Sequence, residues 1–519
     1  MALNKIAFAV LAMASVSAFA ASKAALCVRV PVTAEDLVSQ CAPEVTFFAA
    51  GGIAMRDFYK FAMSTMFDPS KPVVYIKTLN ADGSTENKNQ FAMYGFGKAD
   101  ADASIAGKRL AIMVNTLNGS MAGVNMLLSG AKTGSLLNNV DGKEYQRTIA
   151  LQSVDNMGKG IPYFPDGAGL TGTDGSPAYI LPNVAANLPN LKLLTLNYGI
   201  STADLKTGWG VDKTKTVGIA FTDVRPNEAV PGQLVGGKWD RRGFPYIPIA
   251  MQGFQVIVNN NLYNALVKRD IAERRLPSSC EGVMAVDCQP TIFSAEMTSL
   301  MMGKRPAGWD AATPVTLQRR VDSSGTQAAA QIFFASVPNP DLDKTVRAFA
   351  PVLGANLVDG QFVRGMDSSL TIEVNSNTDS VVSKVANSTT ADAGYVLGVV
   401  SSDRGSNPLF CSAYCSYMNI KSYSVKIDGF SPNAGNFDSP TGFDITNRTA
   451  LTKGYPFQFE FGVVTNAKNK GAQKVVADAF IAAMRNEAIF YRGVVFKGTG
   501  AGQSPYSRGG NNFNPLSQY

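Results

Sequence analysis

Apolar residues recur along the chain in an order that indicates a strand, a turn of small residues and then a helix. In each of three places an apolar run typical of a strand leads into glycine or hydroxyl side chains, and then into apolar residues at helical spacing. The three units lie at 45–59, 110–128 and 314–335. This repetition predicts an α/β protein with mixed, mostly parallel sheets, whose ligands bind at the carboxyl ends of the strands.

Two more strand patterns, at 244–259 and 456–465, indicate segments that cross between two lobes and form a hinge. A chain of 519 residues is too long for one ordinary core, so two lobes are expected. The expected organisation is a first part of lobe 1 at 21–255, lobe 2 at 256–454, a return to lobe 1 at 455–497 and a flexible tail at 498–519.

Turn-forming residues dominate the region near 130–215, which we interpret as an insertion in lobe 1. Its glycine- and aspartate-rich part at 158–182 is expected to be a surface loop. Residues 166–175 lack the ligand spacing and the distal glutamate of an EF-hand calcium loop, so we predict no metal site there.

The N-terminus has the pattern of an export signal. Lys5 precedes an apolar run that ends on Ala18-Phe19-Ala20, the small-x-small sequence of a signal-peptidase site. We therefore expect residues 1–20 to be removed and the protein to be periplasmic or secreted. No later stretch approaches the roughly 20 apolar residues of a transmembrane helix, so no membrane span is expected after removal.

Charge and residue types restrict the chemistry. The formal charge of +7, which becomes +6 without Lys5, is spread along the chain, and no basic helix indicates nucleic-acid binding. The chain has no histidine, which excludes histidine-dependent triads, zinc sites with histidine ligands and imidazole acid–base catalysis. Paired catalytic carboxylates are not evident, so we predict neither an enzyme nor a cofactor.

Six cysteines fall into three close pairs along the chain. In an oxidising compartment the simplest interpretation is three local disulfides, although other connectivities remain open. The pairs are Cys27 with Cys41, Cys280 with Cys288, and Cys411 with Cys415.

The stretch QRRVDSSGTQAAAQIFF, residues 318–334, places an arginine pair and hydroxyl side chains where a strand changes into a helix. The first amides of a helix and its dipole attract anions, and an arginine matches two oxygens of a tetrahedral oxyanion. Arg320, Ser324, Gly325 and Thr326 therefore form a candidate oxyanion site. It is not a nucleotide P-loop, because the glycine–lysine signature is absent. A structural interpretation stays open, in which Asp322 or Ser323 caps the helix and Arg319 and Arg320 are solvated.

These residues resemble the phosphate-binding proteins of bacterial ABC transporters, which are type II periplasmic binding proteins. The family's sequence of arginine, any residue, aspartate, small residue and Ser-Gly-Thr stands here at 320–326. Its upstream Gly-Lys and Trp-Asp pairs match Gly303-Lys304 and Trp309-Asp310. The resemblance implies a two-lobed fold with a two-strand hinge.

Two more family turns occur in the same order along the chain. The Gly-Ser-x-x-Gly turn matches 119–123 and implies that Ser120 is a hydroxyl donor. The Gly-Ala-Ser-Asp turn matches 218–223 more loosely and implies that Asp223 accepts the proton of hydrogen phosphate. The family's first loop, a Thr-Phe pair, falls on Gly52-Ile53, where only backbone amides remain to donate.

The resemblance implies a periplasmic receptor that captures phosphate or a similar tetrahedral oxyanion for an ABC permease and its ATPase. The alternative is an exported interaction or structural protein that keeps the fold but has an altered or lost ligand. The expected ligand-binding residues are Gly52, Ile53, Ser120, Asp223, Arg320, Ser324, Gly325 and Thr326.

Overall fold

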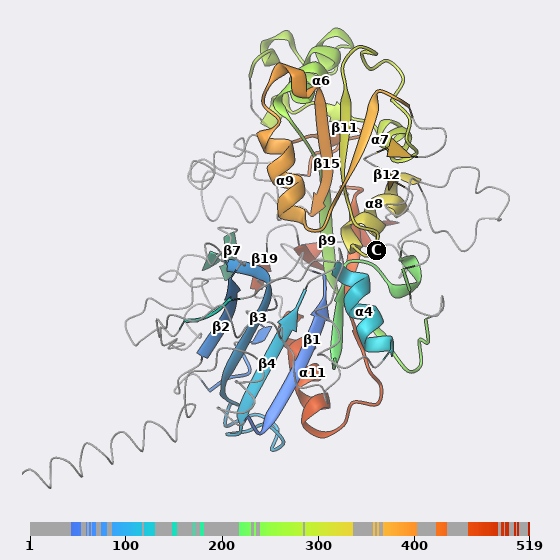
Figure 1. Ribbon diagram of the computed structural model, residues 1–519. Helices are drawn as coiled ribbons and strands as arrows, with labels where there is room; N and C mark the ends of the chain where they lie inside the picture. The colour runs from blue at the N-terminus through green and yellow to red at the C-terminus, as the bar shows by residue number, and fades with distance from the viewer. Residues whose placement is uncertain are drawn as a thin grey trace, which may run out of the picture.

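The computed structural model describes the main elements of two lobes (Figure 1). The described residues are 43–52, 59, 62–63, 65–68, 74–79, 86–116, 119–129, 148–152, 170–171, 177–180, 217–229, 233–234, 239–283, 286–335, 357–358, 361–362, 367–401, 422–432, 455–485, 489–491, 494–497, 503–504, 506–507 and 517–518. The predicted signal peptide lies outside them.

Lobe 1 is built on a mixed sheet with parallel strands at its centre. Its principal strands are β3 (Glu86–Phe96), β4 (Arg109–Asn115), β1 (Val45–Gly51), β8 (Ile219–Thr222), β18 (Gln458–Thr465) and β9 (Tyr246–Val258). β1 pairs in parallel with β4 and β8, whereas β3, β18 and β9 are antiparallel to their neighbours. Every residue of β1 is buried, because helices cover both faces of the sheet.

The alternation of side chains along β1 separates the two faces of this sheet. Ala50 packs in the same cluster as Met121 of α4 (Gly119–Ser129). Phe47 packs instead in the cluster of Phe480 from α11 (Gly471–Met484). α4 and α11 therefore cover opposite faces, and the helix predicted near 471–486 is present.

Lobe 2 has a smaller sheet. Its parallel strands are β14 (Leu370–Asn375), β11 (Val315–Arg320) and β15 (Tyr395–Ser401). β9 is antiparallel to β15 and to the short strand β16 (Tyr423–Ser424). The apolar cluster on one face includes residues of α6 (Asn260–Ala272), α7 (Ser294–Met301) and α8 (Gly325–Ala335), and α9 (Thr378–Asn387) covers the other face.

β9 runs through both sheets and joins the lobes. Its residues up to Gly253 pair with β18, and its residues from Phe254 onward pair with β15. The Phe254 amide donates to the Phe457 carbonyl at 2.9 Å, which places the second crossing segment beside the first. An α/β fold with two lobes is therefore confirmed, with more antiparallel pairing around the parallel centres than the sequence indicated.

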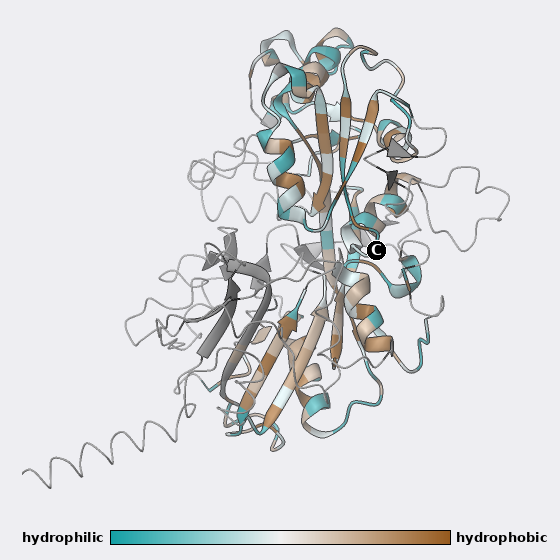
Figure 2. Ribbon diagram, viewed as in Figure 1, coloured by the Kyte–Doolittle hydropathy of each residue, from teal (hydrophilic) through white to brown (hydrophobic). Residues whose placement is uncertain are grey.

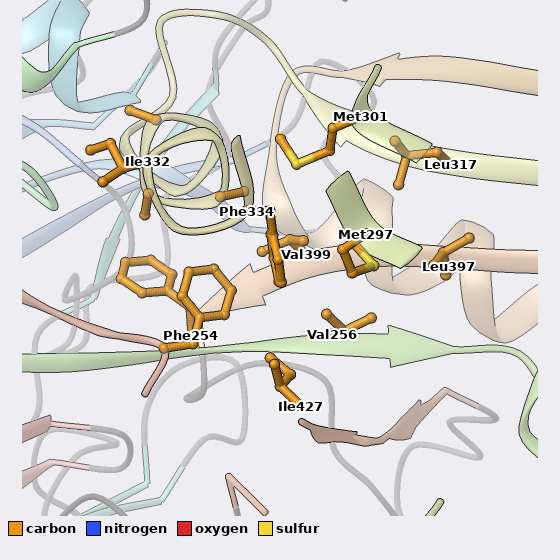
Figure 3. Close-up of a cluster of buried hydrophobic side chains, with 14 of the residues drawn as sticks. Phe254, Val256, Met297, Met301, Leu317, Ile332, Phe334, Leu397, Val399 and Ile427 are labelled. Atoms are coloured by element: carbon orange, nitrogen blue, oxygen red, sulfur yellow. The ribbon is translucent and has the colours of Figure 1, made fainter. Parts of the chain in front are cut away.

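The apolar core continues across this junction. Phe457 lies 5.4 Å from Phe254 of β9 and 5.1 Å from Phe334 of α8, measured between ring centroids. Figure 3 shows Phe254 and Phe334 in one cluster with Val256, Ile332 and Val399. Figure 2 shows the apolar residues concentrated in the strands of both lobes and hydrophilic residues on the outer helices.

Short strands extend the sheet of lobe 1 at its edges. Three of them lie in the region interpreted as an insertion: β5 (Thr148–Gln152), β6 (Leu170–Thr171) and β7 (Pro177–Ile180). Of these, β6 and β7 lie within 158–182, the part expected to be a surface loop. β5 pairs with β2 (Val74–Leu79), and β7 pairs with β19 (Ile489–Tyr491).

Near the C-terminus, β20 (Val494–Lys497) pairs with β9, and three two-residue strands follow within 503–518. Among the described helices, none has the length and apolar character needed to cross a bilayer.

A disulfide joins Cys280 to Cys288, as predicted. It closes a turn of 3₁₀ helices between α6 and α7, and both cysteines are buried. The other two predicted pairs, Cys27–Cys41 and Cys411–Cys415, lie outside the described residues.

Replacing Cys280 and Cys288 together by alanine should lower the free energy of unfolding by about 2 kcal/mol, because the unfolded chain gains the entropy of an open loop. Guanidinium unfolding of the variant and the wild type measures the difference. Equal midpoints would contradict a stabilising role for this cross-link.

Candidate functional site

Loops that follow four strands of the two lobes meet at one place. In lobe 1 the parallel register aligns the ends of β1, β4 and β8, so Gly52, the start of α4 and Asp223 lie at the same edge. In lobe 2, β11 ends at Arg320 and the chain turns into α8. Figure 1 shows α4 and α8 approaching each other between the lobes.

Gly52, Ser120 and Asp223 form the lobe 1 side of the site. The Asp223 amide donates to the Ser120 hydroxyl at 3.3 Å. A Cβ on Gly52 would lie 2.7 Å from Ser120 Oγ and 2.9 Å from Asp223 Oδ1, so only glycine fits beside these side chains. The Gly52 carbonyl accepts a hydrogen bond of 2.8 Å from the Tyr59 hydroxyl, which holds this backbone in place.

The start of α8 closes the site from lobe 2. A Cβ on Gly325 would lie 2.5 Å from Asp223 Oδ2 and 2.8 Å from Asp223 Cβ. Close by, the Met121 amide of α4 donates to the Ser323 carbonyl at 3.0 Å. Gly119 has a φ of +81°, which favours glycine, and a Cβ there would lie in tight contact, 3.0 Å from Ser324 Cα. The lobes are therefore in contact over the site, in a closed arrangement.

Two helix N-termini point to this contact. The first amides of a helix lack intrahelical partners and carry partial positive charge. In α8, Ser324 Oγ accepts from the Gln327 amide at 3.4 Å, which caps the helix. Ser120, Ser324 and Thr326 are all buried. The remaining amides at the two helix starts provide donors for an anion.

Asp223 is a buried carboxylate in this positive environment. Its side chain is almost fully inaccessible, and among the described residues Oδ1 has no hydrogen-bond partner. Burial raises the pKa of Asp223 to about 6, although the Ser120 hydroxyl and the Arg320 charge favour the ionised form. Such a carboxylate, when ionised, can accept a hydrogen bond from a ligand that carries a proton.

Arg320 is the buried cation on the opposite side. Its terminal nitrogens bond to the Thr378 hydroxyl and, at 3.0 Å, to the Ser376 carbonyl, while Nε has no partner within the described parts of the chain. Burial lowers the pKa of Arg320 to about 10, and the charges of Asp223 and Asp379 oppose this shift. Arg320 is therefore positively charged at neutral pH.

The solvated interpretation of the arginine pair is wrong. Arg319 is 4% exposed and Arg320 2% exposed. Asp322 forms a buried ion pair with Arg319. The residue that caps the helix is Ser324. The strand β11 is covered on both faces, and this burial removes both arginines from water.

The structure brings together Gly52, Ser120, Asp223, Arg320 and Gly325, with Ser324 and Thr326 buried in the same loop and helix start. Ile53 lies outside the described residues. Sequence reasoning missed Thr378 and Ser376, which follow β14 and hold Arg320. The parallel pairing of Arg320 with Asn375 is the feature that brings them there, and no sequence motif marks it.

Gly325→Ala should hold the lobes apart, because the new Cβ overlaps Ser120 and Asp223. We expect hydrogen exchange at the Met121 amide, which bonds to Ser323, to accelerate about tenfold or more. Lys268→Ala is the control, since Lys268 is an exposed side chain of α6 in lobe 2. Unchanged exchange in Gly325→Ala would contradict a closed site of this geometry.

Asp223→Asn should stabilise the anion-free protein at neutral pH. Because the pKa of Asp223 is raised in the folded protein, the wild type loses stability as the pH rises from about 4 to about 6. The variant does not, because its amide stays neutral. The variant should be more stable by about 3 kcal/mol near pH 7.5, with the difference vanishing near pH 4. Urea unfolding across this range measures it, and a difference independent of pH would contradict the burial of an ionised Asp223.

No family model and no curated protein sequence matches this chain. Among solved structures it is similar to a putative phosphate ABC transporter substrate-binding protein with bound phosphate from Clostridium perfringens, at 11% identity, with 85% of this chain and 92% of that chain covered and a TM-score of 0.35.

It is also similar to an ABC-type phosphate transport receptor from Vibrio cholerae, at 14% identity, with 59% of this chain and 87% of that chain covered and a TM-score of 0.25. A third similar structure is a possible phosphate binding protein from Planctomyces limnophilus, at 12% identity, with 48% and 64% covered and a TM-score of 0.22. With similarity this low, the functional conclusion depends on the geometry of the site.

Proposed function

We propose that this protein is an exported solute-binding receptor that encloses hydrogen phosphate, or a similar protonated tetrahedral oxyanion, between its lobes. The observation that carries the proposal is the pair of buried, opposite charges at the lobe contact. Asp223 Oδ1 and Arg320 Nε each lack a hydrogen-bond partner among the described residues. Buried polar groups in proteins are nearly always paired, so an acceptor and a donor left open together support a ligand that supplies both.

The charges favour an anion that carries a proton. Arg320 and the two helix N-termini bind negative oxygens, because they provide donors and positive potential. The hydroxyl of hydrogen phosphate donates a hydrogen bond to the Asp223 carboxylate. Sulfate has no proton at neutral pH, and its oxygens would face the carboxylate without a hydrogen bond, which disfavours it.

The closed arrangement favours a free inorganic anion over an organic ester. Ser120, Asp223, Arg320, Ser324 and Thr326 are each at most 2% exposed. An ester group would have to leave between α4 and α8, where Gly119 lies against Ser324. Closing around β9 and the neighbouring crossing segment would enclose the ligand, and an ABC permease would be the partner that opens the lobes and receives it.

Calorimetric titration of the mature protein with phosphate and with sulfate tests the proposal. We expect saturable heat with phosphate, at least tenfold weaker binding of sulfate, and loss of about a hundredfold or more in phosphate affinity in Arg320→Ala. Lys384→Ala is the matched control, because it removes an exposed cation from the same lobe. Absence of heat with both anions in folded wild type would reject the receptor and favour an exported interaction protein that has lost its ligand.

A further inference from the structure

A second group of charged side chains, partly shielded from water, lies close to Asp223. Arg225, two residues further along the chain, forms an ion pair of 3.0 Å with Glu460 of β18. Its guanidinium lies 5.2 Å from the centroid of the Tyr246 ring in β9. The Tyr246 hydroxyl in turn donates to the Glu460 carbonyl at 2.9 Å. Two neighbouring strands, β9 and β18, thus meet the arginine that follows β8.

The register between β9 and β18 shifts next to this group, opposite Phe461 and Gly462, where β9 carries one extra residue, Ile249. Gly462 is required there, because a Cβ would lie under 3.0 Å from the ring and hydroxyl of Tyr246. Bulges turn the local strand and redirect a side chain. The register shift follows Glu460, whose carboxylate reaches Arg225.

The Arg225–Glu460 ion pair connects the two chain segments just beyond the end of the backbone pairing between β8 and β18. The last described pair between β8 and β18 is Thr222 with Gly462. Asp223 therefore lies beyond the ladder, on a turn. Arg225 holds that turn to β18 through Glu460, and its amide donates at 2.9 Å to the buried carboxylate of Glu228.

This ion pair is shielded from water. The Arg225 and Glu460 side chains are 23% and 10% exposed. Burial and the carboxylate of Glu460 raise the pKa of Tyr246, so its hydroxyl stays protonated and donates. Separating a shielded charge pair would leave each charge without its partner in a poorly hydrated place, so the pair and its aromatic contact constrain the geometry of the loop.

We propose that Arg225 and Glu460 are positioning residues that hold the Asp223 carboxylate in the oxyanion site and so enable recognition of the ligand's proton. The proposal rests on the proposed function. Neither residue contacts the ligand in this scheme. Their effect reaches it through Asp223 alone, because Arg320 is held separately by the loop after β14 in the other lobe.

Because Arg225 and Glu460 act only through Asp223 in this proposal, a double-mutant cycle has a specific expected outcome. The phosphate dissociation constant is measured by calorimetry for wild type, Glu460→Gln, Asp223→Asn and the double variant. Glu460→Gln should weaken phosphate binding about tenfold in the wild type and less than about twofold in the Asp223→Asn background. Arg225→Met should weaken binding by a similar factor, and Arg225→Lys should restore most of the affinity.

Two further measurements separate positioning from loss of folding. Thermal unfolding of each variant reports stability, and Glu373→Gln is the matched control, because it breaks an exposed ion pair in the other lobe. If Glu460→Gln weakens phosphate binding by the same factor with Asp223 and with Asn at this position, its effect is a general loss of stability, and the proposal is overturned. Wild-type affinity in Glu460→Gln would also overturn it and leave the receptor function intact. Failure of the wild type itself to bind phosphate would reject the receptor function, and with it this role.

Discussion

Asp223 and Arg320 are taken out of water together, one from each lobe. Burying a single charge is costly, and the two pKa shifts show that both groups feel this cost. Their mutual attraction and the hydrogen bonds to Arg320 offset part of it. Since the two groups come from different lobes, they face each other only when the lobes meet, and in the proposed receptor closure and ligand binding would be one event.

Close approach of backbones makes this meeting possible. Gly123 of α4 lies against Gly51, where a Cβ would be under 3.0 Å from the strand backbone, so the helix can start at the edge of the sheet. Gly119 and Gly325 bring the two helix N-termini together in the same way. The donors of the proposed site therefore belong to helices packed on the sheets, which would reduce the entropy lost on binding an anion.

The junction behind the site has two mechanical parts. β9 belongs to both sheets, and the aromatic cluster of Phe254, Phe334 and Phe457 continues the core from one lobe to the other. Beside it, the Arg225–Glu460 pair, next to the register shift between β9 and β18, holds the turn that carries Asp223. The position of the Asp223 carboxylate thus depends on contacts with β9 and β18, which lie at the junction between the lobes.

Local patterns were sufficient to predict the α/β class, the strand–turn–helix units, the crossing strands and the Cys280–Cys288 disulfide, because apolar periodicity and turn residues act over a few neighbours. The site residues 52, 120, 223, 320 and 325 were nominated by motifs, and the structure brings them together.

The short strands of the 130–215 region, the burial of both arginines and the partners of Arg320 could not be read from the sequence. Each depends on residues that are distant in the chain and become neighbours only through sheet pairing. The sequence alone therefore determined the elements and the residue types of the site. Only the tertiary structure decided which charges are desolvated and what each of them faces, because desolvation depends on packing from all sides.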